Sequence, residues 1–135
     1  LADYFVSVNG TNVSTLRADG VIFSTPTGST AYALSAGGPI LEPGLECIQM
    51  TPVCPHSLVS RTMLFSTEKK LEVTFRSRDN TPLYLSIDGQ IQESAERDDK
   101  LFITRSRKFL RLIDIQGNSF FNSVNKKLLN PIKDI

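Results

Sequence analysis

The residues of this chain with the clearest chemical potential lie in one short polar segment, Ser24-Thr25-Pro26-Thr27-Gly28-Ser29-Thr30. It offers five hydroxyl groups and a glycine just before a predicted helix start, where backbone N–H groups attract anions. Such a segment can bind a phosphate or lie along a nucleotide. Equally, a loop rich in Ser and Thr can use its hydroxyls to cap its own helix. The segment has no lysine, so it is not the phosphate loop of the nucleoside triphosphatases, and we do not expect it to hydrolyse a triphosphate alone.

Arg17 and Asp19 bring a guanidinium and a carboxylate to the start of the strand that precedes this loop. The carboxylate can accept hydrogen bonds from an amide or a ribose hydroxyl, and the guanidinium can bind an anion. An ion pair on a turn fits the same spacing. Gln90, after the turn signal Asp88-Gly89, reads as a solvated strand residue, and His56 as a hydrogen-bonded structural histidine.

No metal cluster or catalytic triad can be recognised in the sequence. Cys47 and Cys54 lack the C-x-x-C spacing of zinc and redox sites, which favours reduced thiols in a cytoplasmic protein. The basic stretch Lys100–Arg111 is interleaved with apolar residues, so we expect a solvated face or a subunit contact there and no nucleic-acid binding. No apolar run approaches the length of a membrane helix, and we expect no membrane association.

Length and composition predict one compact domain. The chain has 135 residues, of which 40% are apolar and 21% charged, with a net charge of +1. It begins at Leu1, almost inside the strand-like run Tyr4–Val8, and we expect it to be a piece of a longer protein. Asn9-Gly10 separates that run from Thr11–Leu16 and is the dipeptide most typical of a two-residue hairpin turn.

The elements around the polar loop follow from apolar runs and breakers. Val21–Phe23 is a continuous apolar run, which predicts a strand buried on both faces. Ala31–Ala36 favours a short helix, with Ser29 or Thr30 as its cap and Gly37-Gly38-Pro39 as its stop.

The rest of the chain is mostly β in pattern. Leu71–Phe75 and Leu83–Ile87 alternate at period two and are expected to pair, and Leu101–Thr104 and Phe109–Ile115 are predicted as further strands. Helical spacing returns only from Asn118 to Pro131. The predicted fold class is mainly β: an antiparallel two-sheet sandwich-like domain with a short internal helix and a C-terminal helix.

Several segments together closely resemble the signature of the ATP-dependent NAD kinases, over nearly the whole chain. The segments are Arg17-Ala18-Asp19-Gly20, Ser24 through Ile40, Thr51-Pro52-Val53-Cys54-Pro55-His56-Ser57-Leu58, Ile87-Asp88-Gly89-Gln90, and Ser119-Phe120-Phe121-Asn122 with Lys126-Lys127-Leu128.

The resemblance implies an enzyme of two domains, which transfers the terminal phosphoryl group of ATP, or of polyphosphate in some members, to the 2′-hydroxyl on the adenosine ribose of NAD. The product is NADP. Residues 1–135 resemble a single C-terminal NAD-binding domain. The family's Gly-Gly-Asp-Gly motif, with its general base, and its Asn-Glu/Asp motif belong to an N-terminal domain outside these residues. The resemblance thus implies no catalytic residue in this chain, and we expect the chain alone to be inactive.

The same resemblance implies which residues contact NAD: Arg17, Asp19, Thr30, Ala31, Tyr32, Ala33, Leu34, Ser35 and Gln90. Asp19 would accept hydrogen bonds at the nicotinamide end, Tyr32 would supply a flat surface and a hydroxyl, and Ala31 would allow close approach. Arg17 would serve a phosphate or orient Asp19.

The resemblance also implies the partners. A homodimer or homotetramer is expected, in which neighbouring C-terminal domains share one NAD site. ATP and a divalent metal, Mg²⁺, would bind through the other domain of the full-length enzyme, and this chain alone is expected to bind no metal. Two alternatives remain at this stage: a related lipid kinase domain, and a non-catalytic β-sandwich that self-associates or binds nucleic acid through Lys100–Lys127.

Overall fold

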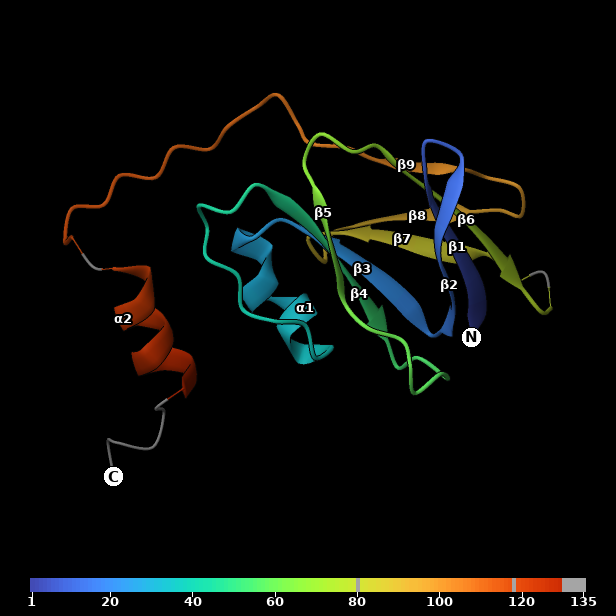
Figure 1. Cartoon of the computed structure of the whole chain (residues 1–135), viewed down its shortest axis with the longest axis horizontal. Coiled ribbons are helices and arrows are strands. Elements are labelled where there is room, and N and C mark those ends of the chain that lie inside the picture. Colours follow the sequence, from blue (N-terminus) through green and yellow to red (C-terminus); the bar gives the residue numbers. More distant parts are fainter. Residues whose placement is uncertain (80, 118, 130–135) are drawn as a thin grey trace. The chain divides into compact units, whose positions relative to one another are not determined.

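The structure, a computed structural model, describes residues 1–79, 81–117 and 119–129, with only the backbone of Ile91. The chain divides into two compact units, Leu1–Arg105 and Ser106–Ile135, which are described separately below. Among the described residues, the first unit holds nine strands and two short helical turns, and the second holds a short helical segment (Figure 1). The predicted fold class, mainly β with antiparallel sheets and few helices, is confirmed.

In the described residues, the strands form three hydrogen-bonded sheets where the sequence predicted two. The largest has the order β2-β1-β6-β9 and consists of β1 (Ala2–Val8), β2 (Thr11–Ala18), β6 (Leu71–Ser77) and β9 (Leu101–Ile103). The second has the order β3-β4-β5 and consists of β3 (Gly20–Ser24), β4 (Cys47–Val53) and β5 (Met63–Ser66). The third pairs β7 (Leu83–Ile87) with β8 (Ile91–Ala95).

The hairpin β1–β2 forms where Asn9-Gly10 predicts it. Both turn residues have positive φ, 52° at Asn9 and 78° at Gly10, as a type I′ turn requires. The register shifts by one residue at a bulge between Val6 and Ser7. As a result, Asp3 pairs with Arg17, a contact that matters below.

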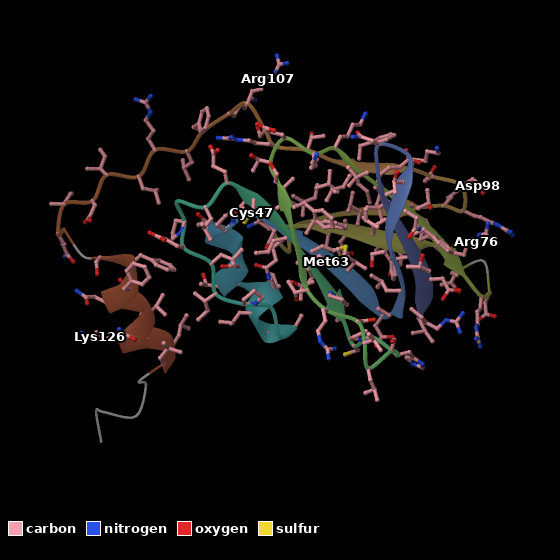
Figure 2. All side chains as sticks on the ribbon, viewed as in Figure 1. Cys47, Met63, Arg76, Asp98, Arg107 and Lys126 are labelled. Carbon is pink, nitrogen blue, oxygen red and sulfur yellow. The ribbon has the colours of Figure 1, made fainter. Side chains whose placement is uncertain are left out.

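The core of the first unit draws on all three sheets. Tyr4 and Val6 of β1 are buried opposite Phe75 and Val73 of β6. Ile48 and Met50 of β4 and Ala95 of β8 belong to the same cluster. Met63 on β5 packs against this cluster (Figure 2). Alternate residues along β1 and β6 are buried, so each of these two strands buries one apolar face.

Three strand predictions are corrected. The run Val21–Phe23 lies in β3 at the edge of its sheet, so it is half-buried and not buried on both faces. Leu71–Phe75 does not pair with Leu83–Ile87, because β6 lies between β1 and β9 while β7 turns back at once into β8. Phe109–Ile115 forms no strand and pairs with no described strand. Alternation marks a chain as suited to a sheet but does not select its partner.

The second unit contains α2 (Phe120–Val124), followed by a π-helical turn, η2 (Asn125–Leu129). Ser119 caps α2, because its hydroxyl accepts a hydrogen bond from the Asn122 N–H at 3.2 Å. The predicted ends of this helix, Asn118 and Pro131, lie outside the described residues. In the part of the chain that the structure covers, every helix is too short or too polar to cross a bilayer.

Candidate NAD site

The polar loop leaves the end of β3 as a 3₁₀ turn, η1 (Thr27–Thr30). Its hydroxyls bond mostly to its own backbone: Ser29 Oγ donates to the Pro26 carbonyl at 2.7 Å, and Thr30 Oγ1 donates to the Thr27 carbonyl at 3.4 Å. Thr25 Oγ1 accepts from the Gly28 N–H at 3.1 Å. These bonds engage the hydroxyls within the loop itself, which argues against direct phosphate binding by them, but none of them caps a helix.

The helix α1 (Tyr32–Ser35) follows directly and lies beside β3 (Figure 1). The predicted cap by Ser29 or Thr30 is wrong: the N-cap is Ala31, and no side chain caps the helix. The predicted stop is confirmed, with Gly37 at φ 88° and the Gly38 N–H donating to the Ala33 carbonyl at 2.9 Å.

This short helix presents a mixed face. Ala31, Tyr32 and Ser35 are exposed, Leu34 is half-buried and Ala33 is buried against the body of the unit. Ala33 therefore packs the helix against the body of the unit, whereas its exposed neighbours in the predicted set are accessible to a ligand. Tyr32 is 68% exposed, unusually open for a large aromatic side chain.

Tyr32 lies against the turn between β7 and β8. A Cβ added to Gly89 would lie 2.9 Å from the Tyr32 hydroxyl and 3.6 Å from two of its ring carbons. Asp88 and Gly89, with φ of 50° and 70°, form this turn, and Gln90 follows it, exposed. The structure therefore brings together two predicted parts of the site that are far apart in sequence, Tyr32 and the turn that ends at Gln90.

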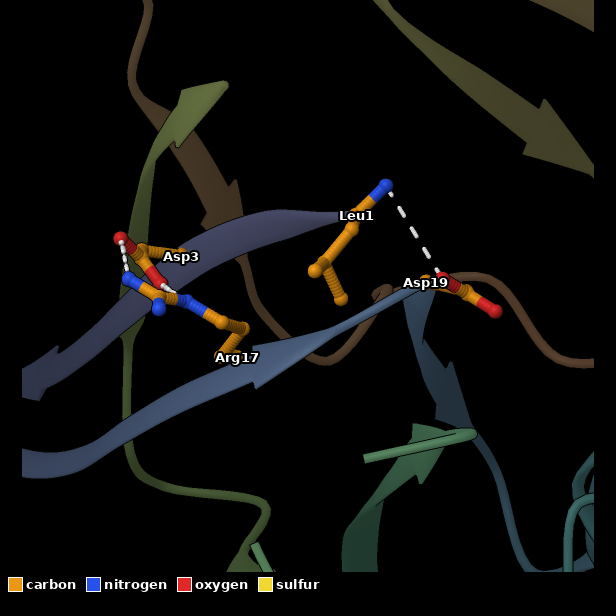
Figure 3. A network of polar contacts seen from close by, with 4 residues as sticks. All are labelled: Leu1, Asp3, Arg17 and Asp19. Atoms are coloured by element: carbon orange, nitrogen blue, oxygen red, sulfur yellow. Dashed lines mark hydrogen bonds and ion pairs between the residues drawn. The ribbon is translucent and has the colours of Figure 1, made fainter. Parts of the chain in front are cut away.

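Arg17 binds Asp3 rather than Asp19 (Figure 3). Its guanidinium donates from Nε to Asp3 Oδ1 at 2.5 Å and from Nη2 to Oδ2 at 2.8 Å, the two-pronged geometry of a strong ion pair. The hydrogen bond from Arg17 holds the pKa of the Asp3 carboxyl below its usual range, and the same bond raises the pKa of Arg17. Asp19 stays largely exposed, with its backbone N–H donating to the Val53 carbonyl at 3.0 Å.

Asp19 and the loop before α1 lie at opposite ends of β3. A strand of this length spans about 17 Å, at roughly 3.3 Å per residue. Asp19 and Arg17 precede β3, whereas Thr30 and Tyr32 follow it. The structure thus gathers Tyr32 and Gln90 on one side and leaves Arg17 and Asp19 apart from them.

The other candidate features contribute nothing to this site. The His56 side chain is exposed, and its backbone N–H donates to the Arg17 carbonyl at 2.9 Å. Among the described residues, no three His, Cys, Asp or Glu side chains cluster as metal ligands would. Two shallow hollows, of about 350 and 330 Å³, are lined by none of the predicted contact residues. Arg76 and Asp98 line the first (Figure 2).

Sequence reasoning missed the residues beneath the loop. Gln49 and Thr51 on β4 are buried, and with Ser29 they are polar side chains inside an otherwise apolar interior. Two polar residues alternating with Ile48 and Met50 were the available signal. They lie under Gly38, whose role the sequence suggested only as a helix stop.

Comparison with known proteins places the chain in a family. Residues 1–115 match the sequence model of the family described as "ATP-NAD kinase C-terminal domain". An NAD kinase of Citrifermentans bemidjiense is 39% identical over 128 residues, covering 95% of this chain and 44% of that protein. A bifunctional NADP phosphatase/NAD kinase of Methanocaldococcus jannaschii is also 39% identical, covering 95% of this chain and 22% of its own length.

Solved structures give the same result. An NAD kinase from Archaeoglobus fulgidus in complex with ATP superposes with a TM-score of 0.67 at 36% identity, covering 78% of this chain and 40% of that one. Yeast NADH kinase complexed with NADH superposes with a TM-score of 0.68 at 33% identity, covering 77% of this chain and 30% of that one. The chain thus spans less than half the length of these relatives. It belongs to the ATP-NAD kinase C-terminal domain family.

Proposed function

We propose that this chain is the NAD-binding domain of an NAD kinase, which in the whole protein transfers a phosphoryl group from ATP to the 2′-hydroxyl on the adenosine ribose of NAD. Family membership supports this proposal, as do relatives named NAD kinase and neighbours solved with ATP and with NADH. The alternatives of a lipid kinase domain and of a non-catalytic sandwich receive no comparable support.

The observation that carries the proposal is the contact of Tyr32 with the Asp88–Gln90 turn. The exposed Tyr32 ring lies beside Gly89, and the residues on either side of that glycine, Asp88 and Gln90, are exposed and carry a carboxylate and a side-chain amide. An aromatic face can stack on a flat heterocycle, while the amide and carboxylate can bond to its polar edges or to ribose hydroxyls. Thr30 and Ala31 precede Tyr32 in the chain and Ser35 ends the same helix, and small side chains at these positions would let a ligand approach the backbone.

Arg17 and Asp19 belong to the same function in a different way. Because β3 separates them from Tyr32, we propose that they serve the NAD bound at the helix α1 of a second copy in a homodimer or homotetramer. Arg17 is paired with Asp3 through both prongs, which favours a role in fixing this corner of the sheet over direct binding of a phosphate. Asp19 is largely exposed, with its carboxylate 3.9 Å from the Leu1 amino group, and is the group of this corner that we propose to bond to an amide of the ligand.

The division of chemistry follows from what phosphoryl transfer requires. An acceptor hydroxyl must lie in line with the phosphorus, a triphosphate must have its charge neutralised, and a base must take the hydroxyl proton. This chain's residues would hold the adenosine ribose and fix where its 2′-hydroxyl points. We propose that the base, the triphosphate site and the Mg²⁺ that accompanies ATP belong to the rest of the protein.

We also propose a cytoplasmic location. Cys47 and Cys54 are both free thiols, which suits a reducing compartment.

The direct test is titration of the purified chain with NAD by calorimetry, in the wild type, Tyr32→Ala and Tyr84→Ala. Tyr84 on β7 is a matched control because it is as open as Tyr32, 69% exposed against 68%. We expect Tyr32→Ala to bind NAD about tenfold more weakly, since it loses the stacking surface. Tyr84→Ala should bind as the wild type does. No NAD binding by the wild type, or equal affinity in all three proteins, would reject the proposal.

A further inference from the structure

Three polar side chains near the polar loop and α1 are fully or almost fully buried. Ser29 and Gln49 are 0% exposed and Thr51 is 1% exposed. Gln49 and Thr51 stand two residues apart on β4, so they face the same side of the sheet. Burying a polar group costs free energy unless the group forms hydrogen bonds. The burial of these three side chains beneath the segment that carries α1 therefore needs a physical explanation.

The explanation that we offer is the close packing of these side chains against Gly38, the second of the two glycines that end α1. A Cβ added there would collide with Gln49 Nε2 and would lie 2.9 Å from both Thr51 Oγ1 and the Ala33 carbonyl oxygen. Gly38 is buried, and its N–H donates to that same Ala33 carbonyl. The main chain that ends α1 therefore rests directly on the two polar side chains of β4, at a distance that only glycine allows.

The two side chains hold each other in place. Gln49 Nε2 donates to Thr51 Oγ1 at 2.8 Å, and Thr62 Oγ1 approaches the same hydroxyl at 3.4 Å. Within the loop, Ser29 Oγ donates to the Pro26 carbonyl at 2.7 Å and accepts from the Leu41 N–H at 3.0 Å. Both ends of the segment from Pro26 to Leu41 are thus fixed by buried hydrogen bonds.

We propose that Gln49 and Thr51 are positioning residues for NAD: their hydrogen-bonded side chains seat Gly38 and so hold α1, with Tyr32, in the conformation that binds the ligand. This inference rests on the proposed function. The two side chains touch no ligand themselves. If Thr51 loses its hydroxyl, Gln49 Nε2 is left buried without its partner, beside a buried Oε1 that already has none, and we expect the side chain to shift against the Gly38 segment.

The expected cost appears as a smaller population of the binding-competent loop. Apparent affinity falls in proportion to that population, even though every contact residue is intact. A role in core packing alone predicts something different, namely lower thermal stability with unchanged NAD affinity.

The experiment compares five proteins: wild type, Thr51→Val, Thr51→Ser, Gln49→Met and Val73→Ala. Thr51→Val keeps the shape and removes the hydroxyl, whereas Thr51→Ser keeps the hydroxyl. Val73→Ala makes a cavity in the β6 part of the core, away from the loop. The readouts are melting temperature, hydrogen exchange of the Gly38 amide and NAD affinity by calorimetry.

We expect Thr51→Val and Gln49→Met to speed Gly38 exchange and to weaken NAD binding, each about tenfold. Thr51→Ser should stay within about twofold of the wild type in both, and Val73→Ala should lower only the melting temperature. Normal NAD binding by the wild type with unchanged exchange or affinity in Thr51→Val would overturn the inference alone. No NAD binding by the wild type would overturn the proposed function and the inference with it.

Discussion

Asp3 and Arg17 are joined by two hydrogen bonds across the β1–β2 hairpin because a bulge shifts the register by one residue. Val8 pairs with Thr11 next to the turn, and that register, continued along the hairpin, would set Asp3 opposite Leu16. Past the bulge at Val6 and Ser7, Asp3 instead lies opposite Arg17. A local irregularity in one hairpin thus decides that Arg17 lies opposite the Asp3 carboxylate.

The Asp3–Arg17 pair predicts weaker folding in acid. The pKa of Asp3 is lowered chiefly by the Arg17 hydrogen bond, so the folded chain prefers the charged carboxylate more than the unfolded chain does. The pair's stabilisation is therefore present above the ordinary carboxyl pKa and is lost as the pH falls through the lowered value, below about pH 4. Urea unfolding from pH 7 to pH 2 should show a shallower acid decline in Asp3→Asn than in the wild type.

Glu93→Gln, at an exposed position of β8, is the control for this series. It should follow the wild-type profile in acid. Parallel acid profiles for Asp3→Asn and the wild type would contradict the role given to the pair.

The Tyr32–Gly89 contact predicts that Gly89→Ala weakens NAD binding. Gly10→Ala is its matched control, because Gly10 and Gly89 both have positive φ, 78° and 70°, but Gly10 has nothing within 4 Å of an added Cβ. Both variants should lose about 1 to 2 kcal/mol in the free energy of unfolding from backbone strain. Only Gly89→Ala should also displace Tyr32, lowering NAD affinity by about tenfold. Equal affinities in the two variants would show that the contact does not shape the site.

The proposed division of chemistry predicts that the 135-residue chain makes no NADP from NAD, ATP and Mg²⁺. The chain would orient the acceptor hydroxyl, but a base and a triphosphate site are also required. The measurement is NADP formation by a coupled enzymatic assay, with heat-inactivated protein as the blank. A rate above that blank would refute the division.

The unit boundary predicts that residues 1–105 fold without the rest. The whole apolar cluster, from Ala2 to Ala95, lies inside this unit. Beyond it, Leu110, Leu112, Ile113 and Ile115 are each more than 80% exposed, a run that favours self-association. A chain ending at Arg105 should keep a cooperative thermal transition by circular dichroism and scatter less light at high concentration than the full chain. Loss of the transition would place essential packing after Arg105.

The sequence predicts those parts of the fold whose cause is local. Asn9-Gly10 carries the φ preference of its turn, and Gly37 carries that of the helix stop, so both were predictable. The partner of β6 was not, because the alternation of Leu71–Phe75 suits any neighbour and β1 lies about seventy residues away in sequence. The same holds at the site. The resemblance names Tyr32 and Gln90 as contacts, while the seat of Gly38 on Gln49 and Thr51 depends on how β4 packs beneath the loop.

The position of β3 has a consequence for how the domain would respond to its own concentration. If Asp19 of one copy completes the NAD surface at Tyr32 of another, the ligand bridges two chains and favours their association. NAD would then bind more tightly as the protein is concentrated and would hold the oligomer together on dilution. In that case β3 keeps Asp19 and Tyr32 of one chain apart, so that NAD binding and the association of two chains are thermodynamically linked. A change in either one would change the other.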